Sequence, residues 1–398
     1  MKILYHHRIA SKDGQNVHVE EIIRALRELG HEVLVVAPAV HDESEFGHEG
    51  GWVTRLKKAL PKAVYEVLEM AYSVHDYLRL AKAIRGFRPD AIYERYNLFL
   101  FSGVWASKRF GLPLLLEVNA PLAEERAKYD GLAFEKLATQ AQAYVWKRAD
   151  YCLPVTRVLA GHLERAGVPL TRMAVIHNGI NEAEFSVIPD SDSAKAELNL
   201  SGCTVLGFTG FVRSWHGLDK IIRWMAGGGR ENVRLLVVGE GPARAELEAL
   251  ANALGISERV VFTGLVQRAR VPRLVAAFDI ALQPAVVAYA SPLKLFEYLA
   301  LGRPVVAPRA PNLMEILVDG ENALLFDPDL PGDLENVLSR VCDAPDLRAR
   351  LGLMARKNIH ERGFTWRANA ERILGLFQQC LDHRGDRSSK VTGVRLNG

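Results

Sequence analysis

The chain has 398 residues, more than a single compact core usually holds, so its length predicts two domains. Hydrophobic residues make up 49% of the chain and charged residues 24%, the composition of an ordinary soluble globular protein. A net charge of +3 is small for this length. It argues against a nucleic-acid-binding protein, which concentrates basic residues on one face.

The cysteines are far apart in the sequence, at Cys152, Cys203, Cys342 and Cys380, and no pair has the spacing of a zinc or redox motif. The first residues predict a short buried strand and not a signal peptide. No stretch reaches the roughly 20 apolar residues that span a bilayer. We therefore expect a reduced, cytoplasmic protein.

Short apolar runs alternate with amphipathic helical segments in the first half, as in a parallel sheet covered by helices on both faces. Helices are predicted over Val17–Leu29 and Leu132–Arg148. A polar stretch, Asn181–Gly202, predicts a linker. The predicted strands are Lys2–Tyr5, Glu32–Ala37, Ala91–Tyr93, Leu114–Val118 and Tyr151–Val155.

The alternation restarts at Thr204, and we therefore predict an α/β protein with two Rossmann-like, doubly wound domains that face a central cleft. The domains cover residues 1–184 and 203–364. A last helix is predicted from Trp366, and the polar, aperiodic residues 384–398 predict a disordered tail. The strands of the second domain are predicted at Val205–Thr209, Val233–Val238, Val260–Thr263, Ile280–Gln283 and Val305–Ala307.

The strongest local pattern is the segment Ser291–Gly302, SPLKLFEYLALG. Ser291 suits an N-cap and Pro292 the first helical position, so we predict a helix whose free N–H groups form a site for phosphate. Lys294 adds a positive charge, and Glu297 can accept hydrogen bonds from ribose hydroxyls. A capped surface helix with a Lys–Glu pair is the alternative.

Three loops at other predicted strand ends of the second half contain glycine. In residues 207–217, Gly210 lets backbone amides approach a diphosphate, with Arg213 and His216 as charge partners. Residues 237–242 resemble a dinucleotide-binding turn, but Arg244 stands where that turn needs a small residue. Residues 262–266 can present backbone groups to a nucleobase. An ordinary turn is the alternative for each loop.

In the first half, residues 11–18 predict a polar loop in which Gly14 lets the backbone approach a ligand. Glu117 and Asn119 end a predicted strand, where the polar side chains of a site are expected. The histidines lack a third ligand in a recognisable frame, so we expect satisfied or exposed histidines and no metal site.

Together these motifs resemble the family 4 glycosyltransferases of the GT-B fold, which are retaining enzymes that use nucleotide sugars. The resemblance covers nearly the whole chain. It implies an N-terminal acceptor-binding domain, a C-terminal donor-binding domain, and a crossover helix, residues 365–383, that returns to the first domain. The motifs that carry it are His177–Ile180, Gly239–Pro242 with Arg244, Phe262–Gly264, Ser291–Gly302 and Phe364–Trp366.

From the residues and the resemblance together we assign candidate roles. The catalytic candidates are Asn119, Glu117, Lys294, Arg213 and His216. The donor-binding candidates are Gly14, Gly210, Gly239, Val266, Tyr289, Ser291, Pro292, Leu293, Leu295 and Glu297. In the family's E-x7-E motif, Glu297 matches the second glutamate and Tyr289 stands at the first. We expect the helix start at Ser291 and Lys294, with either Arg213 or a protonated His216, to stabilise the leaving diphosphate without a metal ion.

The resemblance implies transfer of a hexose from a UDP- or GDP-sugar to a glycan, lipid-linked or small-molecule acceptor, with retention of configuration. We expect no cofactor and no nucleic-acid partner. The alternatives are a nucleotide-sugar epimerase of the same fold and a catalytically silent nucleotide-sugar-binding subunit. Residues 52–62 mix basic and apolar side chains, which predicts either peripheral contact with the inner face of the membrane or an ordinary solvated helix.

Overall fold

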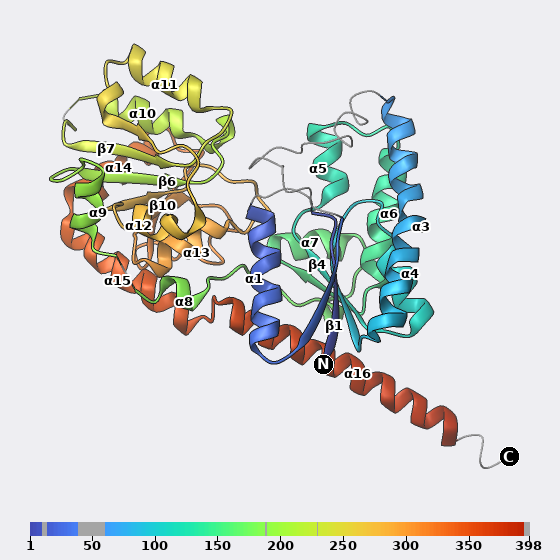
Figure 1. Cartoon of the computed structure of the whole chain (residues 1–398). Helices are drawn as coiled ribbons and strands as arrows, with labels where there is room; N and C mark the ends of the chain where they lie inside the picture. Colours follow the sequence, from blue (N-terminus) through green and yellow to red (C-terminus); the bar gives the residue numbers. More distant parts are fainter. Residues whose placement is uncertain (10–13, 39–59, 188, 229, 394–398) are drawn as a thin grey trace. The chain divides into compact units, whose positions relative to one another are not determined.

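The computed structural model describes residues 1–9, 14–38, 60–187, 189–228 and 230–393. The chain divides into an N-terminal unit, Met1–His177 with Trp366–Gly398, and a C-terminal unit, Asn178–Thr365. Each unit contains a parallel β-sheet with helices packed around it (Figure 1). The predicted α/β class with two doubly wound sheets is confirmed.

The N-terminal unit has a five-stranded sheet in the order β2-β1-β3-β4-β5. Strands β3 and β4 are buried along their whole length, as expected for the centre of a parallel sheet. The elements of this unit are β1 (Lys2–His6), α1 (Gly14–Glu28), β2 (Glu32–Val36), α3 (Lys62–Phe87), β3 (Ala91–Arg95), α4 (Ser102–Phe110), β4 (Leu114–Val118), α5 (Leu122–Tyr129), α6 (Glu135–Arg148), β5 (Tyr151–Pro154), α7 (Arg157–Arg165) and α16 (Trp366–Gly393).

The last helix, α16, packs within the N-terminal unit, which confirms the predicted crossover helix. The Trp366 ring stacks on His18 of α1, with 4.8 Å between the ring centroids. The amide of Asn369 donates a hydrogen bond to the carbonyl oxygen of His177 at 2.7 Å. A stacked ring and a backbone contact therefore fix the start of α16 on this unit.

The far part of α16 corrects one prediction. The helix continues to Gly393, so the disordered tail predicted from Arg384 is wrong for residues 384–393. Arg384 forms an ion pair with Asp150 at 2.8 Å and donates to the carbonyl oxygen of Gly111, and no proline follows it to end the helix. Residues 394–398 lie outside the described residues.

The C-terminal unit has a six-stranded sheet in the order β11-β10-β9-β6-β7-β8. Strand β11 was not predicted, because its short apolar run lies between polar turns. The elements of this unit are α8 (Glu182–Phe185), α9 (Ser191–Glu197), β6 (Thr204–Thr209), α10 (Leu218–Ala226), β7 (Val233–Val238), α11 (Arg244–Ala253), β8 (Val260–Phe262), α12 (Val271–Val275), β9 (Ile280–Leu282), α13 (Leu293–Ala300), β10 (Val305–Pro308), β11 (Ala323–Phe326), α14 (Asp333–Asp343) and α15 (Pro345–Glu361).

The segment predicted as a linker, Asn181–Gly202, is part of the C-terminal unit. It contains α8 and α9, which are capped by the side chains of Asn181 and Asp190. Phe185 is buried in the core, and Lys195 forms an ion pair with Asp279 at 2.7 Å. The polar residues that suggested a linker are therefore helix caps and an ion-pair partner.

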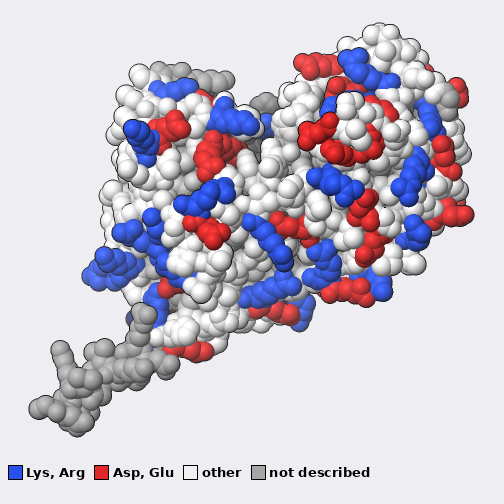
Figure 2. Space-filling model, turned by 180° about the vertical axis from the view of Figure 1, so that it is seen from behind, with Lys and Arg blue, Asp and Glu red and all other residues white. Residues whose placement is uncertain are grey.

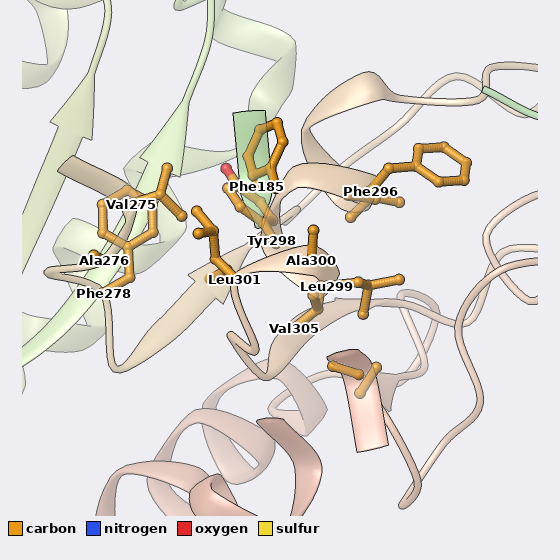
Figure 3. Close-up of a cluster of buried hydrophobic side chains, with 14 of the residues drawn as sticks. Phe185, Val275, Ala276, Phe278, Phe296, Tyr298, Leu299, Ala300, Leu301 and Val305 are labelled. Carbon is orange, nitrogen blue, oxygen red and sulfur yellow. The ribbon is translucent and has the colours of Figure 1, made fainter. Parts of the chain in front are cut away.

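The core of the C-terminal unit surrounds α13. Figure 3 shows Tyr298 and Leu299 of this helix in a cluster with Phe185, Phe278 and Val305, all of them buried. Burial on this scale stabilises by about 25 cal/mol per Å² of apolar surface, so the core holds α13 firmly in place. The helix predicted to bind phosphate is thus a rigid element.

Candidate active site

In the C-terminal unit the strand order reverses between β6 and β9, which are hydrogen-bonded neighbours in the sheet. Doubly wound sheets bind ligands at such a point, outside the carboxyl ends of the strands. The loop after β6 begins with Gly210, and the loop after β9 passes through Tyr289 and Ser291 into α13. The fold therefore brings Gly210 and the predicted phosphate helix to the same edge of the sheet.

Two buried asparagines hold the loop that leads into α13. The amide of Asn178 donates to the carbonyl oxygen of Ser291 at 2.6 Å, and the amide of Asn312 donates to that of Ala290 at 2.7 Å. Neither asparagine was predicted as a site residue, because each is remote from this loop in sequence. The only sequence feature that pointed to either residue was the place of Asn178 in the His177–Ile180 motif.

The hydroxyl of Tyr298 fixes α13 to the end of β6. It accepts a hydrogen bond from the backbone N–H of Thr209 at 2.8 Å, and the two side-chain oxygens lie 3.1 Å apart. Tyr298 is fully buried. The sequence pattern marked this position only as apolar, so its role in placing α13 beside Gly210 was missed.

Helix α13 begins one residue later than predicted, at Leu293. Pro292 is its N-cap, and no side chain caps the helix, so the predicted capping by Ser291 is wrong. The extended conformation of Pro292 moves the helix start away from Ser291, whose hydroxyl is buried and has no hydrogen-bond partner. The backbone N–H of Leu295 donates to the carbonyl oxygen of Pro292. The backbone N–H groups of Leu293 and Lys294 are therefore left for a ligand.

Lys294 lies beside Gly210, as the predicted site requires. Its Nζ atom is 3.6 Å from the centroid of the Phe208 ring, and a Cβ atom on Gly210 would lie 3.1 Å from Nζ. Burial lowers the pKa of Lys294 to about 7, although the nearby Glu297 opposes the shift. No carboxylate of the described residues forms an ion pair with this ammonium group, so it is available to an anion.

Glu297 follows one turn later on α13. Its carboxylate has no hydrogen-bond partner among the residues that the structure describes. Burial raises the pKa of Glu297, while Arg268 and Lys294 act in the opposite direction. A half-buried carboxylate with free acceptor atoms suits a pair of ribose hydroxyls, as the sequence predicted.

Gly239 has a packing role that the sequence did not indicate. A Cβ atom on Gly239 would lie 2.1 Å from the carbonyl oxygen of Gly210, and one on Gly241 would lie 2.2 Å from that of Val212. Gly239 also has a φ of +141°, which disfavours other residues. These glycines let the loops after β6 and β7 pack together. Val266 follows β8 at the same edge of the sheet.

The prediction of a protonated His216 is wrong. Burial, followed by the charges of Lys294 and Arg213, lowers the pKa of His216 to about 3, so the ring is neutral at neutral pH. Its Nδ1 accepts the backbone N–H of Arg213 at 3.0 Å, which fixes the loop after β6. The Arg213 side chain is exposed, with its guanidinium 5.1 Å from the Phe211 ring centroid.

In the N-terminal unit the strand order reverses between β1 and β3, and Glu117 of β4 lies one strand further. Its buried carboxylate pairs with Arg95 and accepts hydrogen bonds from Tyr93 at 2.9 Å and Asn119 at 2.5 Å. Burial raises the pKa of Glu117, but the charge of Arg95 and the hydrogen bonds from Asn119 and Tyr93 lower it more. Glu117 is therefore ionised, and its position favours holding Asn119 over touching a substrate.

His18 of α1 completes this cluster. Its Nδ1 lies 2.9 Å from a guanidinium nitrogen of Arg95, and it also hydrogen-bonds with Asn119. Burial lowers the pKa of His18 to about 4, so the ring is neutral and can accept from Arg95. The half-buried Asn119, just beyond β4, is thus held from two sides, by Glu117 and by His18.

A second buried network in this unit was missed by the sequence analysis. The Nε2 atom of His6 lies 2.8 Å from Asp76, and its Nδ1 atom lies 2.6 Å from Glu94. Burial lowers the pKa of His6, but the bonds to Asp76 and Glu94 outweigh it and raise the value to about 9. The three residues are far apart in sequence and form no short motif.

Gly14 is the first residue of α1, so the predicted polar loop is helical from residue 14 onward. Residues 10–13, and residues 52–59 of the predicted membrane segment, lie outside the described residues. His6 and His18 are both buried and contact charged side chains of the fold, and no group of three potential metal ligands occurs in the described part of the chain. In that same part, every helix is too short or too polar to cross a membrane.

Comparison with known proteins agrees with both units. Residues 12–184 match the model of Glycosyltransferase Family 4, and residues 203–344 match that of Glycosyl transferases group 1. A D-inositol 3-phosphate glycosyltransferase of Acidothermus cellulolyticus is 31% identical over 333 residues, which cover 77% of this chain and 71% of the relative. The chain belongs to the family 4 glycosyltransferases with the GT-B fold and transfers a glycosyl group from a nucleotide sugar.

More distant relatives cover nearly the whole chain. A GDP-mannose-dependent alpha-mannosyltransferase of Mycobacterium tuberculosis is 26% identical over 389 residues, 94% of each chain. The crystal structure of Anabaena HepE in complex with UDP superposes with a TM-score of 0.76 at 20% identity, over 95% of this chain and 100% of that one. The similarity to this crystal structure supports the GT-B fold of the chain.

Proposed function

We propose that the C-terminal unit binds the donor along α13. The diphosphate would lie at Lys294 and at the N–H groups of Leu293 and Lys294, and the ribose at Glu297. The observation that carries this proposal is the lysine at the strand-order reversal, without an ion-pair partner among the described residues and with its pKa lowered by burial. The hydroxyl of Ser291, buried and without a partner, adds a polar group at the same helix start.

This geometry suits the chemistry of glycosyl transfer. Breaking the bond between the anomeric carbon and the phosphate builds negative charge on the leaving diphosphate. Backbone N–H groups and an ammonium group already in place stabilise such charge without reorganisation. We therefore propose that Lys294 and the start of α13 carry this step without a metal ion, and that exposed Arg213 adds charge when donor is bound.

We further propose that the donor is a UDP- or GDP-hexose and that transfer retains the anomeric configuration. Support comes from one relative named for GDP-mannose and from a structural neighbour crystallised with UDP. The N-terminal unit would bind a glycan, lipid-linked or small-molecule acceptor near Asn119. We place the reaction in the cytoplasm, at or near the inner face of the membrane.

A thermal-shift screen with UDP, GDP, ADP and TDP tests the donor site. We expect UDP or GDP to raise the melting temperature, and Glu297→Ala to lose most of that shift. Glu335→Ala, which changes an exposed glutamate on α14 of the same unit, is the matched control and should keep it. A full shift in Glu297→Ala would remove Glu297 from the donor site.

Product analysis tests the reaction itself. Nucleotide sugars incubated with acceptor extract should yield a glycosylated product whose anomeric configuration, read by nuclear magnetic resonance, matches the donor, and chelators should leave the rate unchanged. An altered sugar formed from the donor alone would identify an epimerase. Nucleotide binding without sugar release would identify a silent binding subunit.

A further inference from the structure

Arg8 is the first residue beyond the N-terminal sheet at the carboxyl end of β1. The backbone N–H of His7 still donates to the carbonyl oxygen of Val36 at 3.2 Å. The backbone N–H of Ile9 then turns back and donates to Nδ1 of His7 at 3.1 Å. The strand order reverses between β1 and β3, and doubly wound sheets bind ligands at such a point. Arg8 therefore lies where a ligand of this unit is expected.

The guanidinium group of Arg8 has no hydrogen-bond or ion-pair partner among the residues that the structure describes. The side chain is half-buried, and its Nη1 atom is buried. Figure 2 shows many Lys and Arg side chains beside Asp and Glu on one face of the molecule. A buried donor without a partner is costly, so this group is available to a ligand. Other arginines of the unit that are at least half-buried do have partners, which are carboxylates for Arg24, Arg79, Arg95, Arg126 and Arg384 and backbone carbonyl groups for Arg172.

The ring of Tyr72 on α3 fixes the position of this guanidinium group. The central carbon of the group lies 4.5 Å from the ring centroid. Arg79 of the same helix donates to the Tyr72 hydroxyl at 3.4 Å and to the carbonyl oxygen of Ala37 at 2.5 Å. A ring face attracts a cation but leaves the N–H groups at its edge free for oxygen atoms. Tyr72 thus holds Arg8 without satisfying its hydrogen bonds.

The acidic groups beside Arg79 are balanced by other charges. Asp76 lies 3.7 Å from Arg79 and 2.8 Å from Nε2 of His6. Glu94 lies 2.6 Å from Nδ1 of the same ring. Burial lowers the pKa of His6, but its bonds to the two carboxylates raise the value to about 9, so the ring is charged at neutral pH. These groups compensate one another, and the charge of Arg8 is left without compensation.

We propose that Arg8 binds an anionic group, either a phosphate or a carboxylate, on the acceptor. A guanidinium group donates two parallel N–H groups to two oxygen atoms, and both anions present such a pair. The assignment rests on the proposed function, because it takes the N-terminal unit to bind the acceptor. A neutral glycan would leave Arg8 without a partner. An acceptor with a phosphate or carboxylate near its reacting hydroxyl supplies one.

Transfer kinetics with acceptor extract test the role of Arg8. Arg8→Ala should raise the amount of extract needed for half the maximal rate about tenfold or more, because a charged hydrogen bond is lost. The maximal rate and the KM for the nucleotide sugar should stay the same. Arg8→Lys keeps the charge but not the paired N–H groups, so it should recover part of the loss. An unchanged requirement for extract in Arg8→Ala would overturn the proposal.

The matched control is Arg109→Ala at the end of α4. The guanidinium group of Arg109 also lies over a ring, 6.0 Å from the centroid of Phe110, but its side chain is exposed. Because α4 leads from β3 to β4, its last turn lies at the amino edge of the sheet, away from the expected ligand site. This variant should need the same amount of extract as the wild type.

Melting temperatures distinguish an acceptor site from a structural role and from the donor site. Without ligand, Arg8→Ala should melt close to the wild type, because only the contact with Tyr72 is lost. The thermal shift caused by UDP or GDP should also be unchanged in this variant. Loss of that shift would place Arg8 at the donor and overturn the proposal. Absence of the shift from the wild type would instead contradict the proposed donor site.

Inorganic phosphate and glucuronate test the anion site without the reaction. At equal ionic strength in sodium chloride, either anion should raise the melting temperature of the wild type more than that of Arg8→Ala. The part of the rise that Arg8→Ala loses should persist in Lys294→Ala, which changes only the donor site. Equal rises in Arg8→Ala and the wild type would overturn the proposal even if nucleotide binding is as expected.

Treatment of the extract separates the two kinds of anion. The acceptor should be retained on an anion-exchange resin. Phosphatase should then destroy its activity as an acceptor if the group is a phosphate monoester, and amidation with a carbodiimide should do so if the group is a carboxylate. An active acceptor that passes through the resin is neutral and would contradict the assignment of Arg8.

Discussion

The two units differ in whether the charged side chains near the point of strand-order reversal form ion pairs. In the N-terminal unit the charged groups near this point pair with one another: His6 with Asp76 and Glu94, and Arg95 with Glu117. In the C-terminal unit, Lys294 and Glu297 lie near the corresponding point, and neither forms an ion pair among the described residues. The first unit pairs these charges within the fold, and we propose that the second uses them to bind the nucleotide sugar.

The contrast separates two uses of buried charge. A buried charge without its partner is costly, so each member of a paired network supports the fold. A half-buried charge that has no partner in the free protein, as at Lys294 and Glu297, is a smaller cost to the fold, and ligand binding would remove it. Substitutions in the N-terminal networks should therefore act on stability, and substitutions at Lys294 and Glu297 should act on nucleotide binding.

The largest effect is expected at His6. His6→Ala leaves Asp76 and Glu94 buried without their shared partner, which should lower the free energy of unfolding by about 3 to 5 kcal/mol. Urea denaturation measures this loss. His75→Ala, which changes an exposed histidine of the same unit, is the control and should change little. Equal stability of the two variants would mean that the network is not a structural device.

The next effect is expected at Lys294. Lys294→Ala should lower the rate of transfer by about a hundredfold or more. The variant lacks the positive charge that we propose stabilises the leaving diphosphate. Its melting temperature without nucleotide should stay the same or rise, because burial disfavours this ammonium group. Lys220→Ala, on the exposed side of α10, should behave as wild type in both assays. A destabilised but fully active Lys294→Ala would reverse the proposed division between the units.

A smaller effect is expected at Glu297. Glu297→Gln keeps the shape of the side chain but weakens its hydrogen bonds to hydroxyl groups, and it should raise the dissociation constant for UDP or GDP about tenfold. Isothermal titration calorimetry measures the change. Free phosphate or pyrophosphate should bind the variant and the wild type alike, because neither ligand carries a ribose. A loss with pyrophosphate as well would place Glu297 at the phosphates.

The smallest effect is a pH dependence set by Lys294. Below its pKa of about 7 the ammonium group is already charged, and above it binding of an anion must also take up a proton. Nucleotide affinity should therefore fall as the pH rises, about fivefold between about pH 7 and about pH 8. Lys294→Arg should flatten this profile, because a guanidinium group does not titrate there. A steep profile in that variant would assign the proton to another group.

Much of the fold could be predicted because buried parallel strands are continuous apolar runs, and every strand predicted from such a run is present. The errors have physical reasons. Asn181 and Asp190 are helix caps and Lys195 is an ion-pair partner, but in sequence these polar residues resemble a linker. Helix α3 has too little apolar periodicity to be recognised, because its inner side carries Glu66 and Asp76.

The candidate site was predictable where its residues share one short segment. Lys294 and Glu297 lie one turn apart on α13, and the helical period alone places them together. The positions of Tyr298 and Asn178 depend on contacts with Thr209 and Ser291, which no local pattern indicates. The predicted charge state of His216 was wrong because the pKa of its ring depends on burial beside Lys294, which no local pattern indicates.

The most direct test of the proposed donor site is a crystal structure of the protein grown with UDP or GDP. The diphosphate should lie within hydrogen-bond distance of Lys294 and of the first N–H groups of α13, with both ribose hydroxyls on Glu297. Nucleotide density at any other place, with the start of α13 free of phosphate, would contradict the account.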